Sequence, residues 1–351
     1  EIAQCLVGSE MCIRDSTKIM TLLVAVENSS MDEQVTFTQT GVQNVNADSS
    51  NIGTQVGEVL SMKDCLYALI IKSANDVASQ IAEHIGGTEQ AFIDMMNQRA
   101  QEIGCTNTHF ANSSGLPDDN HYSSARDMAL IMREGLKNDD FRTVIGTADY
   151  TIQPTNMNAQ QRVLHTHHPM FAPESGFYYQ GCIGGKTGTT VAAGHTLVTA
   201  ATRDNTTYIA VTMRAADLGI NCTDSTALFD YAFNNFDTID VNGTKMTVPA
   251  GATVNDLTTE SVDRNGKTMN RYYYNGQYVG YVVAADPTPT PTEAPQNEEE
   301  ATADISTDQT AEQTETAVQD SQTETKGLSQ TSKILLGVMA GMGVLLIILL
   351  I

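Results

Sequence analysis

The hydrophobic positions of residues 16–236 change their period several times along the chain. Some segments place apolar residues three or four positions apart, which is the spacing of an amphipathic helix. These segments are residues 17–28, 61–73, 88–104, 123–138 and 224–236. Ser61 and Thr88 stand where a helix N-cap belongs, and Gly104 stands where a C-cap belongs. The pattern therefore predicts helices along much of this region.

Other segments are rich in β-branched residues and are short, as strands are. These segments are residues 34–38, 149–153, 162–166, 196–202 and 207–214. The last two follow each other with the turn sequence "RDNT" between them, so we expect an antiparallel hairpin. Helices packed on a mostly antiparallel sheet, an α+β fold, are the expected architecture of residues 16–236.

The composition changes after this region and divides the rest of the chain into three parts. Residues 237–285 hold short β-rich runs with turn residues between them, which predicts a small β-rich domain. Residues 286–333 begin with a Pro-rich run and continue as an acidic, Thr- and Gln-rich tract, which predicts a disordered linker. Residues 334–351 carry no charge and approach the roughly 20 apolar residues of a membrane-spanning helix. We therefore expect a C-terminal transmembrane helix.

Residues 1–15 fit none of these patterns. They have neither the basic start nor the apolar run of about 7–15 residues that a secretory signal needs. We interpret them as a foreign or unassigned leader, in which "CLVGSEMCIRDS" resembles translated sequencing-adaptor read-through joined to the chain.

Composition and charge exclude several classes of function. The formal net charge is −23 over 351 residues, so we expect no nucleic-acid partner, because phosphate binding needs a basic surface. The six cysteines form no C-x-x-C pair, which favours isolated thiols over zinc or thioredoxin motifs and leaves disulfides as the alternative. His165, His167 and His168 lack a fourth ligand at a sensible spacing, so we predict neither a metal nor a cofactor.

Candidate chemistry begins at the head of the first predicted helix. In an S-x-x-K motif the side chains at i and i+3 share one helix face, so the lysine amine can take the proton of the serine hydroxyl. Lys18 is the lysine of such a motif. Burial and a second cation, Lys186, would favour the neutral amine that a base must be. Ser73 could pass on a proton, and Asn75 could hydrogen-bond both the lysine and a substrate amide.

A K-T-G motif at Lys186, Thr187 and Gly188 supplies candidate binding groups. Lys186 and Thr187 on a strand edge would bind a substrate carboxylate. Gly188 would let the substrate backbone approach closely. The backbone N–H of Thr189 and that of the nucleophile would then form an oxyanion hole.

These motifs, in this order, resemble those of the low-molecular-weight penicillin-binding proteins, the serine-type D-Ala-D-Ala carboxypeptidases. "STKIMT", "SANDVA", "NTHFANSSGLPDDNHYSSARDMA" and "GGKTGTTVAAGHTLV" carry the resemblance, which covers roughly residues 16–285. It implies a DD-peptidase/β-lactamase-like fold, here with its first strands missing. It also implies removal of the terminal D-Ala from peptidoglycan stem peptides and acylation by β-lactams. The implied location is the outer face of the bacterial cytoplasmic membrane, with residues 334–351 as the anchor.

The chain departs from the family pattern at the nucleophile position. Asp15 stands three residues before Lys18, where the resemblance requires Ser. Ser16 lies about 200° from Lys18 around the helix, so it points away from the amine. We therefore expect the chain as written to lack acyl-enzyme chemistry.

Two other functions stay open at this point. One is a membrane-tethered, non-catalytic pseudoenzyme that binds peptidoglycan, which fits Asp15 as written. The other is a β-lactamase, which is the weaker alternative because no E-x-x-L-N sequence lies between Asn75 and Lys186. Carboxypeptidases and endopeptidases share these motifs, so the sequence leaves that choice open. We interpret His121, Asn112 and Ser113 as residues that order a loop near the cleft.

Overall fold

The computed structural model describes residues 11–12, 17–43, 50–190, 194–264 and 267–284. The predicted linker 286–333, the predicted membrane helix 334–351 and Asp15 lie outside these ranges, so those expectations stay predictions. Among the helices that the structure does describe, none is both long enough and apolar enough to cross a bilayer. Of the predicted leader, β1 (Met11–Cys12) is described, and it pairs antiparallel with β4 (Tyr122–Ser123).

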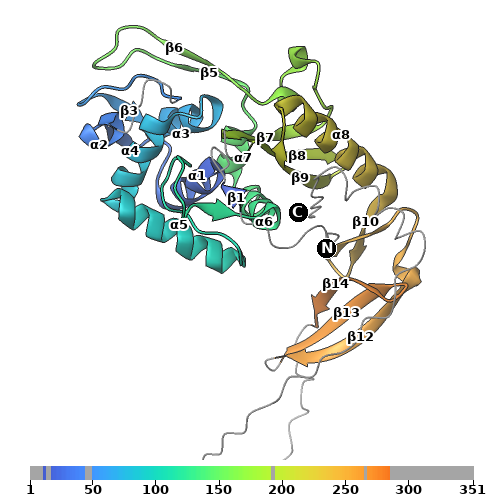
Figure 1. Ribbon diagram of the computed structural model, residues 1–351. Helices are drawn as coiled ribbons and strands as arrows, with labels where there is room; N and C mark the ends of the chain where they lie inside the picture. Colours follow the sequence, from blue (N-terminus) through green and yellow to red (C-terminus); the bar gives the residue numbers. More distant parts are fainter. Residues whose placement is uncertain (1–10, 13–16, 44–49, 191–193, 265–266, 285–351) are drawn as a thin grey trace, which may run out of the picture.

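A group of helices surrounds one central helix (Figure 1). The central helix is α1 (Thr17–Asn28), and residues 17–25 of it are buried. A helix buried on all sides is expected to be mostly apolar, so the buried, ionisable side chain of Lys18 stands out within it. The helices around it are α3 (Met62–Ile71), α4 (Asn75–Gly86), α5 (Glu89–Ile103), α6 (Ala125–Gly135) and α7 (Asp139–Ile145).

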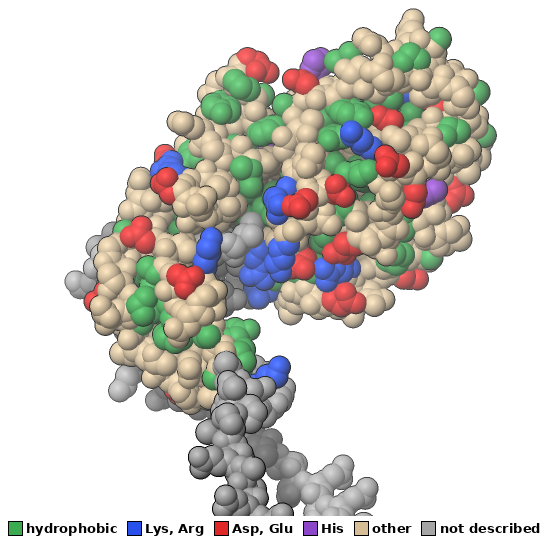
Figure 2. Space-filling view, turned by 180° about the vertical axis from the view of Figure 1, so that it is seen from behind, with side chains coloured by type: hydrophobic (Ala, Val, Ile, Leu, Met, Phe, Trp, Pro, Cys, Tyr) green, Lys and Arg blue, Asp and Glu red, His purple; other side chains and the backbone are tan. Residues whose placement is uncertain are grey.

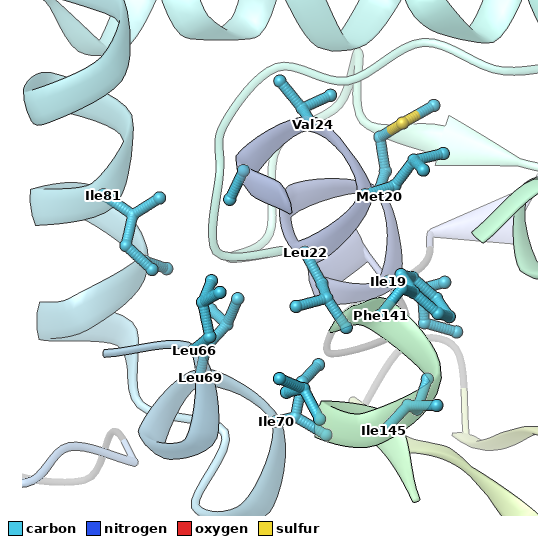
Figure 3. Packing of buried hydrophobic residues seen from close by; sticks show 14 of the residues in the cluster. Ile19, Met20, Leu22, Val24, Leu66, Leu69, Ile70, Ile81, Phe141 and Ile145 are labelled. Atoms are coloured by element: carbon cyan, nitrogen blue, oxygen red, sulfur yellow. The ribbon is translucent and has the colours of Figure 1, made fainter. Parts of the chain in front are cut away.

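Figure 3 shows how the helices pack around α1. Side chains of α1 such as Ile19 and Leu22 meet Leu66 and Ile70 of α3 and Phe141 of α7. Burial of such side chains contributes about 1.5–3 kcal/mol each. The core therefore fixes α1, and with it the position of Lys18.

A three-stranded antiparallel sheet lies beside the helices. It consists of β7 (Cys182–Thr190), β8 (Gly194–Arg203) and β9 (Thr206–Ala215) in that order, so β7 is an edge strand. Val198 on one face belongs to the core around α1, whereas Leu197 on the other face packs under α8 (Leu218–Asn235). The predicted hairpin of β8 and β9 is confirmed.

Short hairpins and turns join these parts. They are β2 (Gln34–Thr36) with β3 (Val59–Ser61), β5 (Asp149–Ile152) with β6 (Arg162–His165), helix α2 (Gln39–Gln43), and the 3-10 turns η1 (Pro169–Phe171) and η2 (Pro173–Ser175). Buried Glu58 accepts hydrogen bonds from Arg162 (2.7 Å) and Thr155 (2.7 Å). This contact fixes the β5–β6 hairpin to the loop before β3.

The remaining strands form a separate β-rich part that extends away from the end of α8 (Figure 1). These strands are β10 (Phe236–Val241), β11 (Thr244–Pro249), β12 (Leu257–Arg264), β13 (Lys267–Tyr274) and β14 (Gln277–Val283), with η3 (Val254–Asp256) before β12. Val241, Met246 and Tyr272 form a small core of their own. The β-rich character matches the prediction for residues 237–285, and the domain boundary itself stays a prediction.

The structure differs from the sequence pattern at several helices. The helix expected over 224–236 begins at Leu218, because Asp217 caps it by accepting a hydrogen bond from the Ile220 N–H. Helix α7 was not predicted, since its seven residues are too few to show a period. The described strand pairs are all antiparallel, and helices pack on both faces of the β7–β9 sheet, as expected for this α+β fold.

Candidate active site

Lys18 is buried at the start of α1, with 0% of its surface exposed. Its Nζ donates hydrogen bonds to Asn75 Oδ1 (2.8 Å) and to the backbone oxygen of Ser114 (2.6 Å). The acceptors come from the start of α4 and from a loop before α6. An amine buried this deeply needs such partners, because desolvation of a charged group is costly. The predicted contact between Lys18 and Asn75 is thus present.

Ser73 and Asn75 lie at the turn between α3 and α4. The N-cap of α4 is Ala74, which makes no side-chain cap bond, so Asn75 is the first helical residue. The side-chain oxygen of Asn75 accepts a hydrogen bond from Lys18, so it does not cap the helix. Ser73 has a positive φ of 58°, which is unusual for a residue with a side chain. Its buried Oγ has no hydrogen-bond partner within the described structure.

Asn112 and His121 hold the loop before α6 in place, as expected from the sequence. Asn112 Oδ1 accepts from the N–H of Gly115 (2.6 Å) and of Leu116 (3.1 Å). His121 Nδ1 accepts from the Ala111 N–H (3.0 Å), so Nε2 carries the ring proton and donates to Thr17 Oγ1 (2.6 Å). The loop interpretation of these residues is therefore supported by their contacts.

The carbonyl group of Ser114 is a site group that the sequence did not indicate. Thr21 Oγ1 donates to the neighbouring carbonyl of Ser113 (2.6 Å), which fixes this part of the loop against α1. Backbone carbonyls carry no residue-specific signal. Only the "NSSG" turn sequence pointed to the loop, and it did not point to a contact with Lys18.

The K-T-G residues lie on the edge strand β7. Lys186 is 4% exposed and stands opposite Val198 of β8. Directly paired residues share a face of a sheet, so Lys186 is on the face that packs against the helices of the α1 core. Its Nζ donates to the backbone oxygen of Thr187 (2.9 Å). Thr189 stands opposite His195, and Thr189 Oγ1 lies 3.0 Å from His195 Nδ1.

Two histidines of the "HTHH" segment lie in different environments. Exposed His165 ends β6 and pairs with Asp149 (2.7 Å). His168 is buried beside β7, and burial together with the Lys186 charge lowers the pKa of its ring to about 4. Within the described part of the chain, no group of three or more potential ligands could hold a metal ion.

Four cysteines are buried or half-buried free thiols. They are Cys65, Cys105, Cys182 and Cys222, and burial raises the pKa of each thiol, to about 12 for Cys105.

Asp127 is buried, and its carboxylate accepts hydrogen bonds from the N–H groups of Thr106 and Asn107. A guanidinium nitrogen of Arg126 lies 3.5 Å from the same carboxylate. On the face shown in Figure 2, Lys and Arg side chains lie beside Asp and Glu side chains.

The arrangement places a buried lysine, an amide and an unpartnered hydroxyl on the helical side and a second buried lysine on the sheet. Solved structures share this fold. A mutant of the Streptomyces DD-transpeptidase matches with a TM-score of 0.60 and 28% identity, over 64% of this chain and 89% of that one. The D-alanyl-D-alanine carboxypeptidase DacD of Francisella tularensis matches with a TM-score of 0.64 and 22% identity, over 80% of this chain and 88% of that one, which shows the fold alone.

Fold and site together define a protein of the DD-peptidase class. The sequence profile of the D-alanyl-D-alanine carboxypeptidase family matches residues 11–217, more than half of the chain. The chain therefore belongs to the D-alanyl-D-alanine carboxypeptidase family, and the resemblance of the motifs is confirmed.

Curated relatives agree with this membership. The D-alanyl-D-alanine carboxypeptidase DacF of Bacillus subtilis is 32% identical over 227 residues, which are 63% of this chain and 56% of DacF. The D-alanyl-D-alanine carboxypeptidase of Streptomyces sp. is also 32% identical over 227 residues, 62% of this chain and 77% of the relative. The matched region thus spans little more than half of DacF.

Proposed function

We propose that this protein is built to remove the terminal D-Ala of peptidoglycan stem peptides through a serine acyl-enzyme, with serine required at position 15. The observation that carries the proposal is the environment of Lys18. It is fully buried at the first turn of α1 and is bonded to Asn75, within one turn of position 15. A hydroxyl three residues before Lys18 would share its helix face.

The chemistry would follow from these positions. The amine of Lys18 takes the proton of the position-15 hydroxyl, whose oxygen then attacks the carbonyl carbon of the penultimate D-Ala. The carbonyl oxygen, now negative, is stabilised by backbone N–H groups, among them that of Thr189 on β7. The peptide C–N bond breaks, the proton goes to the departing amine of D-Ala, and water later cleaves the ester. Lys186 and Thr187 bind the terminal carboxylate in this scheme.

Asp15 makes the chain as written inactive in this proposal. A carboxylate has no proton for Lys18 to take, and its attack on the peptide carbonyl would give a mixed anhydride instead of a stable ester. We expect the chain as written to bind D-Ala-D-Ala peptides without turnover, which is the behaviour of the pseudoenzyme alternative.

A fluorescent penicillin tests the proposal directly. The Asp15→Ser variant should be labelled covalently and should release D-Ala from a pentapeptide, whereas the chain as written should do neither. Thermal unfolding of both proteins controls for folding. Equal labelling of both proteins would refute the role of position 15. Rapid turnover of the penicillin by Asp15→Ser would instead indicate a β-lactamase.

Transfer to an amine is a second candidate outcome of the same acyl-enzyme. One structural neighbour is named a DD-transpeptidase, and the choice between hydrolysis and transfer depends on whether water or an amine attacks the ester. Adding glycine to the Asp15→Ser reaction decides this: a glycine-capped peptide indicates transfer, and the free shortened peptide indicates hydrolysis.

The location is also part of the proposal. Residues 334–351 are uncharged and nearly long enough to span a bilayer, so we propose that they anchor the protein on the outer face of the cytoplasmic membrane. Cell fractionation tests this, since deletion of residues 334–351 should move the protein from the membrane fraction to the aqueous fraction.

A further inference from the structure

Asp76, in the first turn of α4, is a buried carboxylate that the proposed chemistry does not use. Its side chain is fully buried, with 0% of the residue exposed. A carboxylate buried this deeply is costly unless hydrogen bonds replace the water that it has lost. It directly follows Asn75, whose side chain accepts from Lys18. The partners of Asp76 therefore indicate what a buried charge does beside the site.

Most partners of Asp76 lie in the segment 50–54. The N–H of Ile52 donates to Oδ2 of Asp76 (3.2 Å). Thr54 donates to the same oxygen through its N–H (3.2 Å) and through its Oγ1 (3.0 Å). Oδ1 accepts from the N–H of Val77 within α4 (3.0 Å). Each of these partners is a donor, which suits an ionised carboxylate, because that group can only accept.

A further hydrogen bond joins segment 50–54 to the site residue beside Asp76. The N–H of Asn75 donates to the backbone oxygen of Ser50 (2.8 Å). Asn75 thus contacts segment 50–54 through its backbone and Lys18 through its side chain. Two consecutive residues at the start of α4 therefore hold it against one segment, which comes before α3 in the sequence.

The turn just before these two residues has an unusual backbone. Ser73 has a φ of 58°, in the left-handed region that residues with a side chain seldom adopt. A conformation of this kind persists where the surrounding contacts determine it. The hydrogen bonds of Asp76 and of the Asn75 N–H come directly after the turn, so they supply contacts that fix it.

We propose that Asp76 is a positioning residue, which binds segment 50–54 to the start of α4 and thereby holds the side chains of Ser73 and Asn75 where acylation requires them. The inference rests on the proposed function, in which Ser73 and Asn75 act together with Lys18.

Acylation by fluorescent penicillin tests the inference in the full chain that carries Asp15→Ser. Asp76→Ala removes the hydrogen bonds to segment 50–54. The acylation rate at saturating penicillin should fall about 10- to 100-fold, because small misplacements of reacting groups are this costly. Asp76→Asn keeps one acceptor oxygen and should lose less.

Thr54→Val examines the same contact from the other side. It removes one donor to Asp76 and should lower the saturating rate about threefold. Added to Asp76→Ala, it should have no further effect, because both residues act through one contact. Independent, multiplying losses would overturn the inference.

Asp127 provides the matched control. It too is fully buried in the first turn of a helix, α6, and it accepts from the N–H groups of another loop, those of Thr106 and Asn107. Asp127→Ala should lower the thermal unfolding midpoint as Asp76→Ala does, but it should leave the saturating acylation rate unchanged. Equal losses of this rate in the two variants, or an unchanged rate in Asp76→Ala, would overturn the inference. If Asp76→Ala does not fold, Asp76→Asn and Asp127→Asn are compared by the same criteria.

Amide hydrogen exchange separates this inference from the proposed function. If Asp15→Ser is not labelled at all, the proposed function fails, and exchange in the chain as written decides whether Asp76 holds the segment. Asp76→Asn should speed exchange of the Asn75 and Thr54 N–H groups about tenfold or more, since the segment opens more readily. Asp127→Asn should leave both unchanged. Unchanged exchange of these two groups in Asp76→Asn would overturn the inference.

Discussion

The two buried lysines of the site lie in different kinds of surroundings. Lys18, on the helical side, is bonded to Asn75 and Ser114, which are 57 and 96 residues away in the sequence. Lys186, on the sheet side, donates to the carbonyl group of the next residue, and the nearby His168 ring has no hydrogen-bond partner within the described structure.

This difference indicates that the helical side and the sheet side of the site have different roles. Contacts with residues far away in the sequence fix Lys18 as part of the core, so the helical side is preorganised before a ligand binds. On the sheet side, both nitrogens of the buried His168 ring have no hydrogen-bond partner within the described residues. We therefore expect changes on the helical side to affect chemistry and stability, and changes on the sheet side to affect ligand affinity.

The largest expected effect tests the helical side of this comparison. In the Asp15→Ser background, Lys18→Met should slow acylation by fluorescent penicillin about 10³-fold, because it removes the general base. Lys186→Met in the same background should slow it by about 10- to 100-fold, mainly through weaker binding. The rate at saturating penicillin separates the two effects. Similar losses of the acylation rate at saturating penicillin in both variants would contradict the assignment of chemistry to the helical side and binding to the sheet side.

Removal of the partner of Lys18 should cost stability. Asn75→Ala leaves the buried Lys18 amine with a missing acceptor, and the free energy of unfolding should fall by about 2 kcal/mol. Asn75→Asp keeps an oxygen at this position and should lose about half as much or less. Urea unfolding of the two variants and the original chain measures this. An equal loss in both variants would show that the Lys18 contact is not the cause.

A pH dependence should distinguish the sheet side. The pKa of His168 is about 4 in the folded protein, below its ordinary value of 6.5. The unfolded chain therefore binds more protons between these values, and stability falls as the pH falls. Between about pH 7 and about pH 5 this one group should cost about 2 kcal/mol.

The His168→Leu variant isolates that contribution. Urea unfolding at both pH values should show a smaller loss on acidification for His168→Leu than for the original chain. An identical pH dependence in the two proteins would mean that His168 titrates in the folded state as it does in the unfolded chain.

The smallest effect is expected at Ser73, on the helical side itself. Its buried Oγ has no hydrogen-bond partner within the described structure, so Ser73→Ala removes the hydroxyl without breaking a hydrogen bond described there. The free energy of unfolding should stay within about 0.5 kcal/mol. Acylation of Asp15→Ser should nevertheless fall when Ser73→Ala is added. A clear loss of stability would reveal a structural role for this hydroxyl.

The sequence by itself predicted much of this protein. The apolar period predicted α1, α3, α5 and α6 with the caps Ser61 and Thr88, because local spacing and capping residues act over one or two turns. The motifs at Lys18, Ser73 and Lys186 predicted the family, since each motif is a short run of fixed residue types.

Only the tertiary structure decided how these residues are used. It brought the Ser114 carbonyl, from a loop before α6, to the amine of Lys18 beside the predicted Asn75 contact. It also buried His168 against Gly185 while His165 stayed exposed. These outcomes depend on contacts between segments far apart in the chain and on which side chains lose water. Neither is contained in the local pattern of polar and apolar residues.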